Sequence, residues 1–155
     1  MTSFEDPKTT IMKMLKDHFI VTKDNDTTPA ASLISLEFPE EELPRRFEKA
    51  DVILTVGRDD ETSNPLGGVK SLKKYVGLYR CGVWTKDKTG IGGETVCKKA
   101  IQKIKDIIND HAIAPGGNLS TIVKVNTKDD DRQGSPTLFH RIVILRTVHY
   151  GQETL

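Results

Sequence analysis

The chain has 155 residues and nearly balanced charge, with 23 Lys and Arg against 22 Asp and Glu and a formal net charge of +1. That length suits one hydrophobic core, so we treat residues 1–155 as a single domain. The charge balance excludes a bulk positive field that would draw the chain onto nucleic acid or an anionic membrane. The acidic start lacks an apolar leader, and no apolar run approaches the roughly 20 residues that span a bilayer, so we expect neither export nor membrane insertion.

The first predicted element is a helix over residues 7–19. Asp6 offers an N-cap side chain, and the fixed φ of Pro7 suits the first helical turn. Ile11 and Leu15 recur at helical spacing with other apolar residues and define one face. This pattern predicts a helix that lays that face against a core.

A short edge strand is predicted over residues 33–38, after a polar, turn-rich segment. The next residues, 37–46, are rich in glutamate and contain Pro39 and Pro44. Proline removes hydrogen-bond donors from a sheet, and acidic runs favour solvent. We interpret residues 37–46 as an insertion that wraps the outside of the domain.

Two further strands are predicted over residues 51–56 and 75–84, on the basis of apolar alternation. The residues between them, 57–68, are rich in Asp, Asn, Pro and Gly and predict a long polar loop. Within the second strand, Gly77 and Gly82 weaken side-chain packing. Each indicates a bulge or a close approach of the backbone.

The second helix, over residues 94–111, is the best-defined predicted element. Its apolar residues, Ile104 among them, fall on one stripe, and its lysines lie outside it, as in a helix laid on a sheet. Two apolar strands follow, over residues 119–126 and 138–150. A polar loop over residues 127–136 separates them.

The order helix, strand, strand, helix, strand, strand predicts an α+β fold. Two strand pairs, each joined by a loop, favour a mixed, mostly antiparallel sheet with the two helices packed on one face. Cys81 and Cys97 fall in a strand and a helix and lack the spacing of a metal knuckle or redox pair. We expect both to be small buried side chains in a reducing compartment.

No residue pattern indicates catalysis, so we predict no enzyme activity, no cofactor and no metal. The glycine-rich turn from Gly90 to Gly93 precedes a helix, where a phosphate is sometimes held, but it lacks the Lys-Ser/Thr of a P-loop. Three consecutive acids, Asp129 to Asp131, point in different directions in a loop and favour a solvated turn over a cation site. The four histidines show no ligand spacing.

Basic residues interleaved with tyrosines around the second predicted strand are the best local candidates for contact with DNA. A solvated approach to the strand explains them equally well. The candidate DNA-proximal residues are Lys70, Lys73, Lys74 and Arg80.

The two polar loops are the predicted places of subunit or partner contact. Loops of that length in a compact domain are commonly functional or disordered, and we expect both to order against a partner. The candidate contact residues are Asp59, Asp60, Asn64, Lys128, Asp129, Asp130, Asp131 and Arg132.

This order of elements resembles the tail terminator and tail-completion (head-tail joining) proteins of long-tailed viruses. The similarity lies in the opening helix, the strand at Val52 to Val56, the strand ending at Trp84, the helix at Glu94 to His111, and the final strand that closes on Tyr150. It covers most of the chain, with residues 37–46 as the departure, and it brings no signature residues.

The resemblance implies a structural virion protein that forms a homo-oligomeric, hexameric ring. The ring would cap the tail tube protein and join it to neck or connector proteins, and DNA would pass through without sequence-specific binding. The resemblance implies that the protein assembles in the host cytoplasm, lies in the tail-neck region of the virion and has no membrane partner.

Two other classes of function stay open. One is a nucleic-acid-binding, ferredoxin-like α+β module that uses residues 70–80 as its platform. The other is a small enzyme or ligand-binding domain that uses the turn from Gly90 to Gly93.

Overall fold

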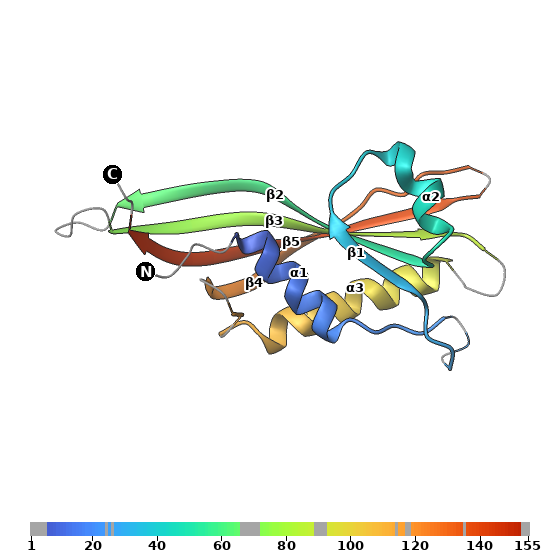
Figure 1. Ribbon diagram of the computed structural model, residues 1–155, viewed down its shortest axis with the longest axis horizontal. Coiled ribbons are helices and arrows are strands. Elements are labelled where there is room, and N and C mark those ends of the chain that lie inside the picture. Colours follow the sequence, from blue (N-terminus) through green and yellow to red (C-terminus); the bar gives the residue numbers. More distant parts are fainter. Residues whose placement is uncertain are drawn as a thin grey trace.

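One mixed five-stranded sheet organises the part of the chain that the computed structural model describes, namely residues 6–23, 25, 27–65, 72–88, 93–113, 115–116, 119–134 and 136–152 (Figure 1). The sheet order is β1-β2-β3-β5-β4; β1 runs parallel to β2, and the other neighbours are antiparallel. The predicted mixed α+β class is confirmed. The strands are β1 (Ser32–Leu36), β2 (Val52–Pro65), β3 (Leu72–Lys86), β4 (Leu119–Asp129) and β5 (Leu138–Gln152), and the helices are α1 (Pro7–His18), α2 (Leu43–Phe47) and α3 (Gly93–Asp110), with a 3-10 turn, η1 (Glu40–Glu42).

Helices α1 and α3 contribute to one hydrophobic core on the same face of the sheet (Figure 1). The Asp6 carboxylate accepts a hydrogen bond from the Lys8 amide at 2.9 Å, which caps α1 as its sequence predicts. Ile11 of α1 and Ile104 of α3 are fully buried. Each helix therefore turns its apolar stripe onto the strands, because that burial offsets the entropy of ordering the chain.

The opposite face of the sheet, which we call the open face, carries a smaller apolar cluster. Residues 37–47, which we call the strap, cross this face and include η1 and α2. The expected count of two helices was wrong, because α2 is a third one. Pro44 stands in the first turn of α2, where its missing N–H is not needed. The strap lies on the outside of the sheet, as expected, but it also packs onto it. Leu43 is only 3% exposed and belongs to one apolar cluster with Ile53 and Trp84.

The predicted loop over residues 57–68 was wrong for most of its length. Residues 57–65 continue β2 and pair with Lys73 to Arg80 of β3, with a register shift between Arg58 and Asp60. Cross-strand pairing decides the conformation here, because a long partner strand satisfies the backbone of a polar segment that has no apolar pattern of its own. Residues 66–71 lie outside the described residues.

The extended pairing produces an arm. Strands β2, β3 and β5 continue together beyond the helices, at the end of the sheet that holds the last residues of β2 and the first residues of β3 (Figure 1). Tyr75 of β3 stacks on His149 of β5, with ring centroids 4.7 Å apart. Side chains from neighbouring strands thus stabilise the arm, as cross-strand pairs do elsewhere in sheets.

The second predicted loop, over residues 127–136, was also too long. Strand β4 continues to Asp129, and an isolated bridge joins Arg132 to Leu138. Residues 130–137 connect β4 to β5, so the predicted loop was wrong only at its start. There, as in residues 57–65, polar residues were read as loop where strand pairing holds them.

Both cysteines are free and buried, as expected. Burial raises the pKa of the Cys81 thiol to about 12 and that of the Cys97 thiol to about 11. Among the described helices, none combines the length and the apolar character needed to cross a membrane.

Candidate functional site

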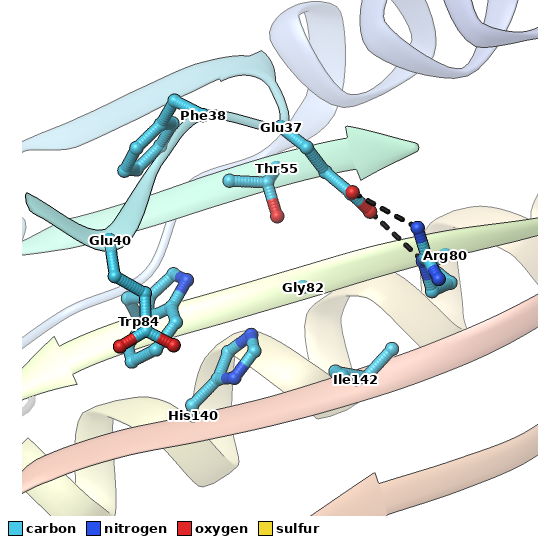
Figure 2. A pocket seen from close by; sticks show the side chains of 9 residues that line it. All are labelled: Glu37, Phe38, Glu40, Thr55, Arg80, Gly82, Trp84, His140 and Ile142. Carbon is cyan, nitrogen blue, oxygen red and sulfur yellow. Dashed lines mark hydrogen bonds and ion pairs between the residues drawn. The ribbon is translucent and has the colours of Figure 1, made fainter. Parts of the chain in front are cut away.

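A pocket of about 290 Å³ lies on the open face, between the strap and the central strands (Figure 2). The strap supplies one wall, and strands β2, β3 and β5 supply the floor and the other wall. The lining residues are Glu37, Phe38 and Glu40 from the strap, Thr55 from β2, Arg80, Gly82 and Trp84 from β3, and His140 and Ile142 from β5.

Gly82 makes the hollow at the floor of the pocket. A Cβ atom at this position would lie 2.7 Å from the Thr55 hydroxyl oxygen and 3.2 Å from Nε2 of His140. The absence of a side chain on β3 therefore lets two polar atoms of its neighbours, β2 and β5, approach the β3 backbone closely, where a methyl group would not fit without a shift. The prediction of a close approach at Gly82 is confirmed.

Trp84 and His140 form a stacked pair at one side of this hollow. Their ring centroids lie 3.6 Å apart and their planes are inclined by 5°. Nδ1 of His140 is 3.4 Å from a carboxylate oxygen of Asp130, a contact too poorly aligned for a full hydrogen bond. Burial lowers the pKa of His140, although Asp130 acts in the opposite direction. His140 is therefore neutral near neutral pH.

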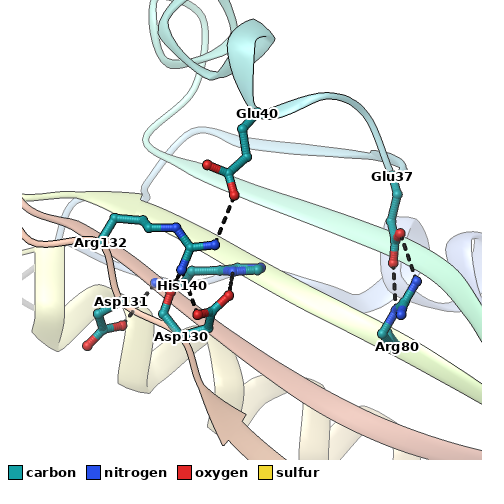
Figure 3. A network of polar contacts seen from close by, with 7 residues as sticks. All are labelled: Glu37, Glu40, Arg80, Asp130, Asp131, Arg132 and His140. Carbon is teal, nitrogen blue, oxygen red and sulfur yellow. Dashed lines mark hydrogen bonds and ion pairs between the residues drawn. The ribbon is translucent and has the colours of Figure 1, made fainter.

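Two arginines, Arg80 on β3 and Arg132 between β4 and β5, bind the carboxylates of the strap (Figure 3). Arg80 donates through Nε and Nη2 to the two oxygens of Glu37, each at 3.0 Å, and through Nη1 to Asp59 at 3.2 Å. Arg132 donates through Nη2 to Glu40 at 3.0 Å. Such half-exposed pairs contribute only about 0–1 kcal/mol each. Their main effect is to fix where the strap carboxylates lie.

The acidic run at the end of β4 is held by two arginines and a backbone N–H. Asp130 accepts a hydrogen bond of 2.6 Å from Nη1 of Arg132, and this contact lowers the pKa of the Asp130 carboxyl. Asp131 accepts the backbone N–H of His140 at 3.0 Å and lies 3.5 Å from Nη2 of Arg141. The nearest guanidinium contact of Asp129 is 3.7 Å, to Nε of Arg141. Asp130 thus pairs with Arg132, whereas Asp129 and Asp131 both lie beside Arg141, and all of these partners belong to this chain.

The other predicted contact residues lie apart from the pocket. Asp60 accepts the backbone N–H of Glu61 at 2.8 Å, and Lys128 is exposed near the end of β4. Asn64 lies in β2 opposite Lys74, and its side chain is not among the described features.

The structure separates the predicted DNA-proximal residues. Arg80 lies under the strap with its guanidinium held by two carboxylates. Lys73 and Lys74 belong to the arm, on β3, and Lys70 lies outside the described residues. They do not form one basic surface in the described part of the chain.

Sequence reasoning named Arg80, as a candidate for DNA contact, but missed most of the other residues that build the pocket. Glu37 and Glu40 read as members of a solvated acidic run, and Thr55 as one residue of an apolar strand. Only Gly82 gave a local signal, because a glycine inside a strand marks a close approach. The remaining signal lies in contacts between distant segments.

We expect the free energy of unfolding to decrease as the pH falls from about 7 to about 5. Burial lowers the pKa of both His140 and His149 in the folded protein below the ordinary value of 6.5. Below pH 6.5 the unfolded chain therefore binds more protons than the folded chain. The contribution of the two neutral histidines to the free energy of unfolding is complete above pH 6.5 and is lost as the pH falls towards the folded pKa values. The loss is at most about 1.4 kcal/mol per pH unit for each histidine.

Urea unfolding across this pH range measures the effect. The His149→Phe variant keeps a ring against Tyr75 and should show a shallower pH dependence, because one titrating group is gone. A wild-type free energy of unfolding that stays constant over this range would contradict the assignment.

In the described part of the chain, no group of three or more His, Cys, Asp and Glu side chains is arranged to hold a metal ion. Neither the protein-family models nor the curated proteins include a match to this sequence.

Proposed function

We propose that this protein is a structural virion subunit that forms a ring on the tail tube of a long-tailed virus and joins the tube to the neck. The observation that supports the proposal best is the pair of sheet edges, which no further strand covers among the described residues, although the Ile122 N–H of β4 donates to the Ala112 carbonyl. Strands β1 and β4 are the two edge strands, and each exposes an aliphatic side chain: Leu36 is 48% exposed and Val125 is 52% exposed. Unpaired edges of this kind are templates for association.

Head-to-tail contact between β1 of one copy and β4 of the next would cover both edges. Such a contact is heterologous, since it joins two different surfaces, and it generates a closed ring when the rotation between copies closes. We propose six copies, as the resemblance to tail terminator proteins implies. The arm would extend from this ring to the tube or to the neck.

The internal pairing of Arg80 also supports a channel through which DNA passes without sequence-specific binding. Its guanidinium donates to Glu37 and Asp59, so it has little capacity left for phosphate. The same pairing weighs against the ferredoxin-like nucleic-acid module, which needs Arg80 as part of its platform.

Light scattering and negative-stain imaging of the purified protein, alone and with tail tubes, test the proposal. We expect a ring in the wild type and its loss in Leu36→Glu and in Val125→Glu, because each puts a charge into the contact. Ile20→Glu is the matched control: Ile20 is 72% exposed, follows α1 and belongs to neither edge strand. A wild type that stays monomeric even with tail tubes would refute the ring.

Engineered cysteines distinguish a head-to-tail ring from a symmetric dimer. Cysteines at positions 36 and 125 together should give a ladder of disulfide-linked species that ends at the ring size, whereas either cysteine alone should give none. Dimers from a single-cysteine variant would indicate a symmetric interface instead. The native cysteines are buried and should not interfere.

A further inference from the structure

Among the described residues, the pocket above Gly82 has no free cation. Arg80 uses Nε, Nη1 and Nη2 on carboxylates of Glu37 and Asp59, and Arg132 uses both terminal nitrogens on Asp130 and Glu40. A guanidinium that is already engaged in this way has little capacity to hold an added anion. The pocket is therefore poorly suited to phosphate or to a carboxylate.

Hydrogen-bond acceptors, in contrast, remain available. Thr55 is 6% exposed and faces the pocket, and within the described residues its hydroxyl has no hydrogen-bond partner (Figure 2). Nε2 of His140 lies on the other side of the same hollow. The carboxylate of Asp130 favours the proton on Nδ1 of neutral His140, which leaves Nε2 as an acceptor. The Thr55 hydroxyl can accept as well as donate, and Nε2 of this tautomer only accepts, so a ligand that reaches both atoms is best served by a donor group.

The excess negative charge around the pocket also favours a ligand that donates hydrogen bonds and carries a positive charge. Among the described residues, the network that holds the strap contains the carboxylates of Glu37, Glu40, Asp59 and Asp130 and the guanidinium groups of Arg80 and Arg132, which leaves two negative charges in excess. Figure 3 shows all of these groups except Asp59. The nearby Arg46 does not offset them, because it is paired with Glu42. One oxygen of Glu40 stays free of Arg132 at the rim. A cationic donor would bring charge complementarity as well as hydrogen bonds.

We propose that this pocket binds a guanidinium or primary ammonium group, with Thr55 and His140 as acceptors in the hollow and Glu40 at the rim. The inference does not depend on ring formation, since it concerns a polar site within one copy. The group would come from a free small cation or from an Arg or Lys side chain of a second copy. Both sources present the same donors to the same acceptors.

Intrinsic fluorescence offers a direct readout, because Trp84 is the one tryptophan in the sequence and lines the pocket. We expect methylguanidinium to produce a saturable change with a millimolar Kd, as suits a small ligand with few contacts. N-methylurea has a similar shape without the charge and should produce no saturable change. Sodium chloride at the same ionic strength removes general salt effects.

The Thr55→Val variant removes one acceptor with little change of shape. It should weaken methylguanidinium binding about tenfold, as expected for a lost hydrogen bond to a charged group. Thr121→Val is the matched control, since Thr121 is exposed on β4 and away from the pocket, and it should bind like the wild type. Absence of a saturable change in the wild type, equal affinity in Thr55→Val, or equal binding of N-methylurea would overturn the proposal.

Dilution distinguishes the two sources of the cation. If a second copy supplies it, Trp84 fluorescence should depend on protein concentration, and methylguanidinium should remove that dependence by competition. If the cation is a free ligand, the methylguanidinium titration should be the same at every protein concentration. Either result, together with the Thr55→Val effect, supports the site.

Discussion

Replacing Ile104 with aspartate should unfold the protein. Ile104 is fully buried at the centre of the α3 stripe, where it packs into the core shared with α1 and the sheet. Truncating such a side chain alone costs about 2–5 kcal/mol, and an unpaired buried charge costs more. The total matches or exceeds the stability of a typical domain, which is about 5–15 kcal/mol. Circular dichroism and proton NMR at neutral pH should show loss of fixed tertiary structure.

The control for this variant is Asn109→Asp on the same helix. Asn109 is exposed, so the same charge stays in water and should cost about 1 kcal/mol or less through the dipole at the end of α3. Cooperative unfolding of Ile104→Asp at a urea midpoint near that of Asn109→Asp would show that α3 does not lie on the core as described.

Helix α3 also shows what sequence patterns could predict in this protein. Its apolar residues repeat at 3.6-residue spacing over 18 residues, so the pattern alone identifies both the helix and its buried face. The apolar centres of β2, β3 and β5 were predictable in the same way, through alternation. Each of these signals is local, because the residues that carry it are near one another in the chain.

The second half of β2 could not be predicted locally. Residues 57–65 are polar because the arm projects beyond the helices, and their strand conformation depends on pairing with β3. A pattern method reads such residues as loop. The same limit explains why β4 was predicted to end before Asp129.

The pocket is still less accessible to sequence reasoning. Glu37 meets Arg80 across 43 residues of sequence, and Glu40 meets Arg132 across 92. Residues of opposite charge are common on any surface, so their identities do not say which will pair. The site exists only once the strap crosses the sheet, and the packing of Leu43 against Ile53 and Trp84 decides that crossing.

Arg141 is expected to be the most important charged residue for stability, and Arg141→Met should lower the free energy of unfolding by about 2 kcal/mol. Its side chain is 11% exposed and lies 3.5 Å from Asp131 and 3.5 Å from Glu94 at the start of α3. Methionine keeps much of the aliphatic volume, so the main loss is the cation opposite Asp131, whose side chain is only 23% exposed. A carboxylate left partly buried without its partner is destabilising.

Arg146→Met provides the matched comparison, because Arg146 is exposed on the same strand, β5, and the substitution is identical. It should change the free energy of unfolding by about 0.5 kcal/mol or less. Adding Asp131→Asn to Arg141→Met should restore part of the lost stability, since the partly buried charge is then removed and an amide oxygen still accepts the His140 N–H. Equal urea midpoints for Arg141→Met and Arg146→Met would mean that the Arg141 cluster is an ordinary surface ion pair, and that β5 and α3 are held together by apolar contact alone.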